Sequence, residues 1–226
     1  IESLAESAFH AQVAPCLYRF VTLPGRGIEI QPAWLEYLQQ HLYILTGFCL
    51  WHLVNYIQKN NPNAPNVTGK LFRPEQRDLK QGHAFWKLVI DEIGPFQCIY
   101  SQQLISSDDF SLDHFLPWSF VAHDLLWNLV PTPKAVNARK GDQLPDISLY
   151  FGTFAQLQYE AVQAVARSNH GRLLEDYALL YKQDSVAALR SLPFAHFRQI
   201  LFDTITPQVQ IARNMGFAAN WSYRAS

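Results

Sequence analysis

The sequence predicts a mainly α-helical α+β fold, with a small central module of short strands between two helical regions. Apolar residues recur at intervals of three to four over residues 33–59 and again over residues 79–93, which is typical of helices with one buried side. Residues 96–100 are rich in aromatic and β-branched side chains, as strands are, and residues 110–115 alternate partly between apolar and polar side chains, as a half-buried strand does. Helical periodicity returns after Pro145. We therefore expect three regions, namely 1–94 (helical), 95–150 (central module) and 151–226 (helical).

Turn residues set the expected bounds of the N-terminal helices. Residues 60–69 are a loop by composition. Pro74 stands where a second helix can begin, since proline favours the first helical position. Gly94 and Pro95 are expected to end that helix. The apolar run over residues 42–54 is too short to span a bilayer, and we interpret it as part of a buried helix.

The C-terminal region reads as a series of amphipathic helices. Residues 154–166 and 173–181 each carry an apolar side. Asp184 is a candidate N-cap for the next helix. Thr206 followed by Pro207 predicts the start of the last helix, because this order is that of a cap and a first helical residue.

Composition limits the class of protein. The chain has 18 Lys and Arg against 19 Asp and Glu, a formal net charge of −1, so its bulk charge gives no support for nucleic-acid binding. Its apolar fraction of 49% indicates a packed protein rather than a disordered one. The three cysteines are far apart, which argues against a disulfide framework and favours the cytoplasm. The first residues do not form a signal peptide, and no membrane association is expected.

The central stretch concentrates the side chains that hydrolysis of a phosphodiester needs. A histidine with a near-neutral pKa can take the proton of an attacking water. A divalent cation held by hard oxygen ligands can neutralise the charge that builds on phosphorus. Asp113 and His114 supply both types side by side. Residues 110–115 are expected to pair with a strand over 128–130, followed by a helix over 133–140.

At these residues the sequence resembles a known family. Asp113-His114, thirteen residues, Asn128, eight residues, Asn137, two residues and Lys140 form a pattern similar to the HNH (His-Asn-His) endonucleases with their ββα-metal site. The segments "LDHFLPWS" and "NLVPTPKAVNARKGDQLP" look like the two blocks of that family, in the same order.

The resemblance implies a role for each matching residue. His114 would be the general base, and Asn128 would hold its loop and orient its ring. Asp113 and Asn137 would bind Mg²⁺ or Mn²⁺, since an amide oxygen in place of imidazole favours such hard ions. Lys140 would contact phosphate near the helix end.

Two further expectations follow from the same pattern. Arg139, next to the site, is expected to contact DNA. Many family members also carry two CxxC pairs that bind structural zinc. Here the corresponding positions hold Cys98, Ser101, Pro133 and Val136, so no structural zinc is expected.

Plainer interpretations remain open for several residues. A buried histidine such as His114 is often only hydrogen-bonded. His123 is either a second acid or base or an ordinary loop residue. Trp118 and Trp127 stack on bases or form the small core under the loop. Arg73, Arg77 and Lys80 form a phosphate-contacting patch or a solvated helix face.

The expected function is that of a metal-dependent HNH endonuclease that hydrolyses DNA, in bacterial restriction or anti-phage defence. One ββα site cuts one strand, so a double-strand cut would need a homodimer or sequential nicking. The alternative is a non-cleaving subunit that binds nucleic acid or a partner, within a larger defence complex.

Overall fold

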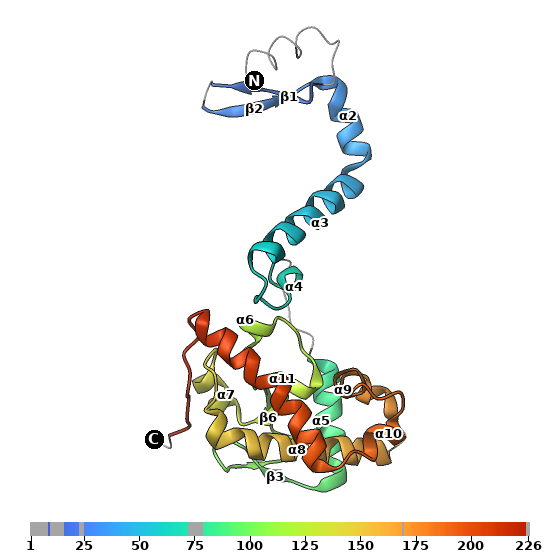
Figure 1. Cartoon of the computed structure of the whole chain (residues 1–226), viewed down its shortest axis with the longest axis vertical. Coiled ribbons are helices and arrows are strands. Elements are labelled where there is room, and N and C mark those ends of the chain that lie inside the picture. Colours follow the sequence, from blue (N-terminus) through green and yellow to red (C-terminus); the bar gives the residue numbers. More distant parts are fainter. Residues whose placement is uncertain (1–8, 10–15, 23–24, 72–78, 169, 225–226) are drawn as a thin grey trace. The chain divides into compact units, whose positions relative to one another are not determined.

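The structure, a computed structural model, describes residue 9 and residues 16–22, 25–71, 79–168 and 170–224. Contacts divide the chain into two compact units, Ile1–Asn61 and Pro62–Ser226 (Figure 1). The division into residues 1–94, 95–150 and 151–226 stays a prediction, but the contacts group the chain differently, because residues 62–94 belong to the second unit. None of the described helices combines the length and the apolar character that crossing a bilayer requires.

The first unit consists of a hairpin and two helices. Strands β1 (Tyr18–Val21) and β2 (Gly27–Ile30) are antiparallel, and helices α2 (Pro32–Gln40) and α3 (Leu42–Asn60) follow. The single helix expected over residues 33–59 is therefore two helices. His41, with φ −105° and ψ 13°, separates them, although neither proline nor glycine marks this position.

The helices of this unit do not bury their apolar side chains within it. No residue of α2 or α3 is buried. Tyr43 is 92% exposed and Ile44 73% exposed. Apolar residues lie on all sides of α3, a pattern typical of helices that are enclosed by other protein. The expected helix is thus present, but the expectation that it is buried is not met, since its own unit leaves its apolar side chains exposed.

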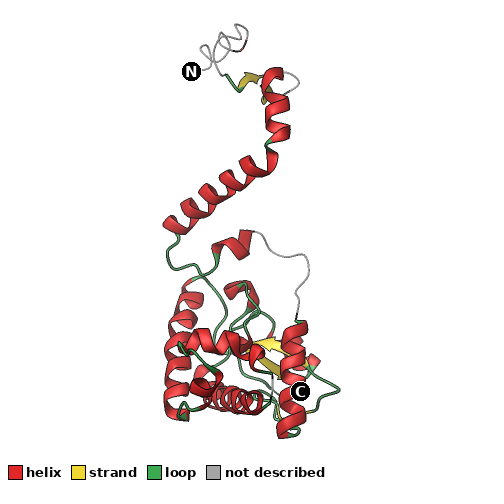
Figure 2. Ribbon diagram, turned by 90° about the vertical axis from the view of Figure 1, so that its right-hand side faces the viewer, coloured by secondary structure: helices red, strands yellow, loops and turns green. Residues whose placement is uncertain are grey.

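The second unit confirms the mainly helical α+β fold class. Figure 2 shows its short strands among helices. Its named elements are α4 (Val67–Leu71), α5 (Lys80–Ile93), β3 (Phe96–Gln97), β4 (Leu104–Ile105), β5 (Ser111–His114), α6 (Trp118–Val121), the 3₁₀ helix η1 (Leu126–Asn128), β6 (Leu129–Thr132), α7 (Lys134–Lys140), α8 (Ile147–Arg167), the 3₁₀ helix η2 (Gly171–Leu174), α9 (Glu175–Tyr181), α10 (Val186–Arg190) and α11 (Phe194–Asn214).

The central module has the expected strand–strand–helix order. β5 and β6 are antiparallel, with Asp113 opposite Val130 and His114 opposite Leu129. Helix α7 then packs against β5, and Pro133 precedes it as its N-cap residue. Proline suits this place because its fixed φ is compatible with helix entry and it has no N–H to leave unpaired.

Helices α5, α8 and α11 enclose this module in one core. Helix α8 contacts both α5 and α11, and α5 contacts β6. The buried side chains of α5 include Phe85, Trp86 and Val89. At Gly82, α5 approaches the hairpin so closely that a β-carbon would lie within 3 Å of the side chains of Leu112 and Leu129. The module is therefore supported by helices from both sides of it in sequence.

Two expected helix starts in the C-terminal region are wrong. Ser185, and not Asp184, caps α10, because its side chain accepts a hydrogen bond from the Ala188 N–H. Pro207 does not begin a helix but lies inside α11. Proline costs a helix one hydrogen bond, and we attribute the continuity of α11 to the burial of Leu201, Ile205 and Val209 along one side.

The bounds of other elements also differ from the expectations. The strand expected over residues 96–100 is limited to Phe96–Gln97. Pro74, Arg73 and Arg77 lie outside the described residues, so the helix start expected at Pro74 and the choice between a basic patch and a solvated helix face stay untested.

Candidate nuclease site

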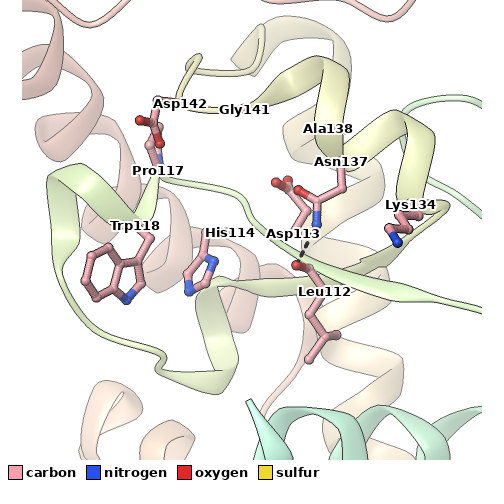
Figure 3. A pocket seen from close by; sticks show the side chains of 10 residues that line it. All are labelled: Leu112, Asp113, His114, Pro117, Trp118, Lys134, Asn137, Ala138, Gly141 and Asp142. Atoms are coloured by element: carbon pink, nitrogen blue, oxygen red, sulfur yellow. Dashed lines mark hydrogen bonds between the residues drawn. The ribbon is translucent and has the colours of Figure 1, made fainter. Parts of the chain in front are cut away.

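A polar pocket of about 360 Å³ lies between the end of β5 and helix α7. Figure 3 shows the side chains around it. Its lining consists of Leu112, Asp113, His114, Pro117, Trp118, Lys134, Asn137, Ala138, Gly141 and Asp142. Three of the predicted site residues, Asp113, His114 and Asn137, thus meet at one pocket, although Asn137 comes from a different element.

Asp113 lines the pocket but is almost completely buried, at 2% exposure. The Tyr100 hydroxyl donates a hydrogen bond of 2.9 Å to Asp113 Oδ2. Lys140 Nζ lies 3.1 Å from Oδ1 and 3.0 Å from Oδ2. Burial raises the pKa of the Asp113 carboxyl, and the Lys140 ammonium and the Tyr100 hydroxyl act in the opposite direction. The carboxylate is therefore held in a fixed orientation by two donors behind it.

Lys140 is not placed to contact phosphate, contrary to the expectation from the resemblance. Its side chain is fully buried, and Nζ donates to the His114 carbonyl oxygen at 2.7 Å as well as to Asp113. A buried ammonium needs such partners, since an unpaired charge in the core is strongly unfavourable. Lys140 thus connects the end of α7 to Asp113 and His114, the last two residues of β5.

Asn137 is oriented by its amide nitrogen. Nδ2 donates to the Leu112 carbonyl oxygen at 2.9 Å and to Ser111 Oγ at 3.3 Å. Because the nitrogen is bound to β5, the amide oxygen points away from the Leu112 carbonyl, toward the Asp113 side chain in the view of Figure 3. One oxygen-bearing side chain from β5 and one from α7 thus belong to the lining of the same pocket.

The His114 ring is held by a carboxylate outside the pocket. His114 Nε2 lies 2.7 Å from Asp124 Oδ1, and Asp124 does not line the pocket. A carboxylate accepts hydrogen bonds, so the nitrogen that faces it carries the proton and Nδ1 is left as the acceptor. Asp124 was not predicted as a site residue. The only signal for it in the sequence is a carboxylate in the loop between the two strands.

Asn128 supports the loop that follows His114 and does not touch the pocket. It is fully buried. Its Oδ1 accepts from the Leu116 N–H at 2.8 Å, and its Nδ2 donates to the Leu116 carbonyl oxygen at 2.9 Å. Its backbone carbonyl also accepts from the Phe115 N–H. Asn128 thus holds the loop and is not a catalytic group, and the side chain that contacts the His114 ring is Asp124 instead.

The neighbouring residues resolve several open alternatives. His123 packs near Trp127 in a tilted arrangement, with ring centroids 5.5 Å apart, and burial lowers the pKa of His123 to about 4. Trp127 is buried in the core, whereas Trp118 lines the pocket. Arg139 is exposed on α7, with its guanidinium 5.8 Å from the centre of the Tyr223 ring, and lines a different pocket.

The family comparison agrees with this geometry. Residues 98–146 match the sequence model of the HNH endonuclease family. The chain contains an HNH domain. The match includes β5, β6 and α7 and every residue discussed at the pocket. No curated protein and no solved structure matches the chain at a significant level.

The HNH pocket fits a small hard cation. Asp113 and Asn137 would hold it through oxygen atoms, which Mg²⁺ and Mn²⁺ prefer. No cluster of three or more His, Cys, Asp or Glu occurs in the described ranges. The Cys98 and Val136 side chains, at two positions of the family's zinc ligands, are buried in the apolar core.

Proposed function

We propose that the chain is a metal-dependent HNH endonuclease that hydrolyses phosphodiester bonds of DNA. The observation that carries the proposal is the convergence of His114, Asp113 and the Asn137 amide oxygen on one pocket within the family match. The Asp124 carboxylate, 2.7 Å from His114 Nε2, supports the proposal because a general base has to be held in a fixed orientation.

In the proposed reaction, His114 Nδ1 takes the proton of the attacking water. Asp124 holds the ring through Nε2 and stabilises the imidazolium that forms. A divalent cation held by Asp113 and Asn137 would supply neutralisation of the charge that develops during the reaction. Tyr100 and Lys140 keep the Asp113 carboxylate in place, and Asn128 keeps the loop after His114 in place. The Asp113 carboxylate, proposed as a metal ligand, and the His114 ring, proposed as the base, are therefore already oriented before the substrate binds.

Nicking of supercoiled plasmid in Mg²⁺ or Mn²⁺ tests the proposal. The His114→Ala variant is expected to cut about 10²–10⁴-fold more slowly, which is the usual contribution of a general base. His196→Ala is the matched control, because His196 is exposed on α11 and does not line the pocket. Equal rates for His114→Ala and the unaltered chain would refute the assignment of the base. Binding of metal and DNA without any cleavage would instead favour the non-cleaving alternative.

We extend the proposal to a role in restriction or anti-phage defence in the cytoplasm, on the basis of the resemblance alone. Bacteria that express the chain are expected to plate phage less efficiently than bacteria with the His114→Ala variant. Equal plating of several unrelated phages would contradict this role and would leave the nuclease proposal untouched.

A further inference from the structure

We propose that Lys134 binds a backbone phosphate of the nucleic acid in the HNH pocket, the role that the resemblance gave to Lys140. This inference rests on the proposed function, because it names a substrate contact of the same site. It follows from the surface that α7 presents to the pocket.

One face of α7 lines the pocket. Lys134, Asn137, Ala138 and Gly141 all belong to its wall, and their spacing of three, four and seven residues places them along one side of a helix. Lys134 lies one turn before Asn137, about 5 Å along the helix axis. The Lys134 ammonium is therefore close to the proposed metal-binding oxygens of Asp113 and Asn137, but it is not one of the groups that orient them.

The charge of Lys134 is available to a ligand. Lys134 is exposed and is the only lysine or arginine in the lining of this pocket. Its side chain has no hydrogen-bond or ion-pair partner in the part of the chain that the structure describes. Nothing in that part therefore competes with a substrate phosphate for the ammonium.

The other two cations of α7 face elsewhere. The Lys140 ammonium donates hydrogen bonds to Asp113 and to the His114 carbonyl oxygen. Arg139 is turned to Tyr223 and to the Arg224 carbonyl oxygen. The two remaining charges in the lining are carboxylates, Asp113 and Asp142. A polyanion in this pocket consequently has one protein cation to contact, at the Lys134 end of the wall.

Such a contact is expected to contribute to substrate binding rather than to the chemical step. Lysine binds phosphate as a point charge, and contacts to backbone phosphate fix the register of the protein on nucleic acid. Each phosphate contact also releases a condensed counterion, so its loss changes the salt dependence of binding in a predictable way.

The test is DNA binding by the full chain in the His114→Ala background, measured by fluorescence anisotropy with a labelled duplex at several salt concentrations. Lys134→Gln is expected to weaken binding about fivefold to tenfold near 0.1 M salt and to reduce the slope of log K against log salt by about 0.9. Lys134→Arg keeps the charge and is expected to restore both. Lys87→Gln, on the exposed side of α5, is the matched control and should alter neither.

Nicking kinetics provide the second measurement. With His114 intact, Lys134→Gln is expected to raise KM and leave kcat nearly unchanged, as the loss of uniform binding does. If the chain nicks DNA but Lys134→Gln behaves like Lys87→Gln, the Lys134 inference is wrong and the proposed function stands. If the unaltered chain neither binds nor nicks DNA, the proposed function fails, and the inference fails with it.

Discussion

At the scale of single residues, the bond between Asp124 and His114 decides which ring nitrogen can accept a proton. An Asp124→Asn variant can donate an N–H to Nε2, which favours the tautomer with a protonated Nδ1. We expect the nicking rate to fall at least about tenfold, with an upper limit near the 10²–10⁴-fold effect of losing the base. Because the contact acts through His114, kcat should fall while KM stays the same. Asp91→Asn, at an exposed carboxylate on α5, should leave kcat unchanged, and an equal kcat in both variants would exclude a positioning role.

Lys140 is the second residue whose replacement is informative. Lys140→Met removes the ammonium and leaves the buried Asp113 carboxylate with one fewer donor. Removal of one partner from a buried ion pair costs about 3–5 kcal/mol, so urea unfolding should show a loss of that size. The Asp113→Asn/Lys140→Met double variant should recover part of the loss, because no unpaired charge remains. A change below about 1 kcal/mol in Lys140→Met, similar to that of an exposed lysine, would show that the pair does not stabilise the fold.

The residues of the site differ in how well the sequence alone predicts their positions. The family resemblance carried by Asp113, His114 and Asn137 predicted that these three residues meet, and all three line one pocket. The burial of Lys140 could have been suspected, because it follows Val136 by four residues and so shares its side of α7. Asp124 could not be found in this way. Its contact with His114 depends on the path of the loop between β5 and β6, which follows from packing and not from a local pattern.

At the scale of elements, the alternation of residues 110–115 and the position of Pro133 were sufficient to predict β5, β6 and α7. Continuity of α11 through Pro207 was not predictable, since the local signal for a helix start was correct and tertiary packing overrode it. The break at His41 has no local signal either. The predictions from sequence were thus wrong for the elements whose ends depend on tertiary packing.

The contact between α5 and the hairpin is expected to control the stability of the site. Gly82→Val would place its side chain against Leu112 and Leu129, whose atoms already lie 2.8 and 2.9 Å from the position of an added β-carbon. Overpacking of this kind typically costs about 1–3 kcal/mol, which chemical unfolding can measure. Gly152→Ala, on an open part of α8, should instead stabilise the helix by up to about 1 kcal/mol. Equal unfolding free energies for Gly82→Val and the unaltered chain would mean that α5 can move away from the hairpin.

At the scale of the whole molecule, the extent of the hydrophobic core indicates which fragment of the chain folds by itself. Every member of the main hydrophobic cluster lies between Phe85 and Ala212, within the unit Pro62–Ser226. The described residues of the first unit contribute exposed apolar helices and no part of this cluster. A fragment of residues 62–226 is therefore expected to unfold cooperatively in thermal denaturation, with a Tm within a few degrees of the corresponding transition in the full chain.

A shorter fragment separates the two ways of dividing the chain. Residues 95–226 begin at the predicted start of the central module but lack α5, which supplies Phe85, Trp86 and Val89 to the core. Deletion of one buried aromatic side chain alone costs about 3–5 kcal/mol, and whole domains are stable by only about 5–15 kcal/mol. We thus expect no cooperative transition for residues 95–226 by near-ultraviolet circular dichroism. A cooperative transition in both fragments would show that the boundary near residue 94 is real and that α5 only covers a module already stable without it.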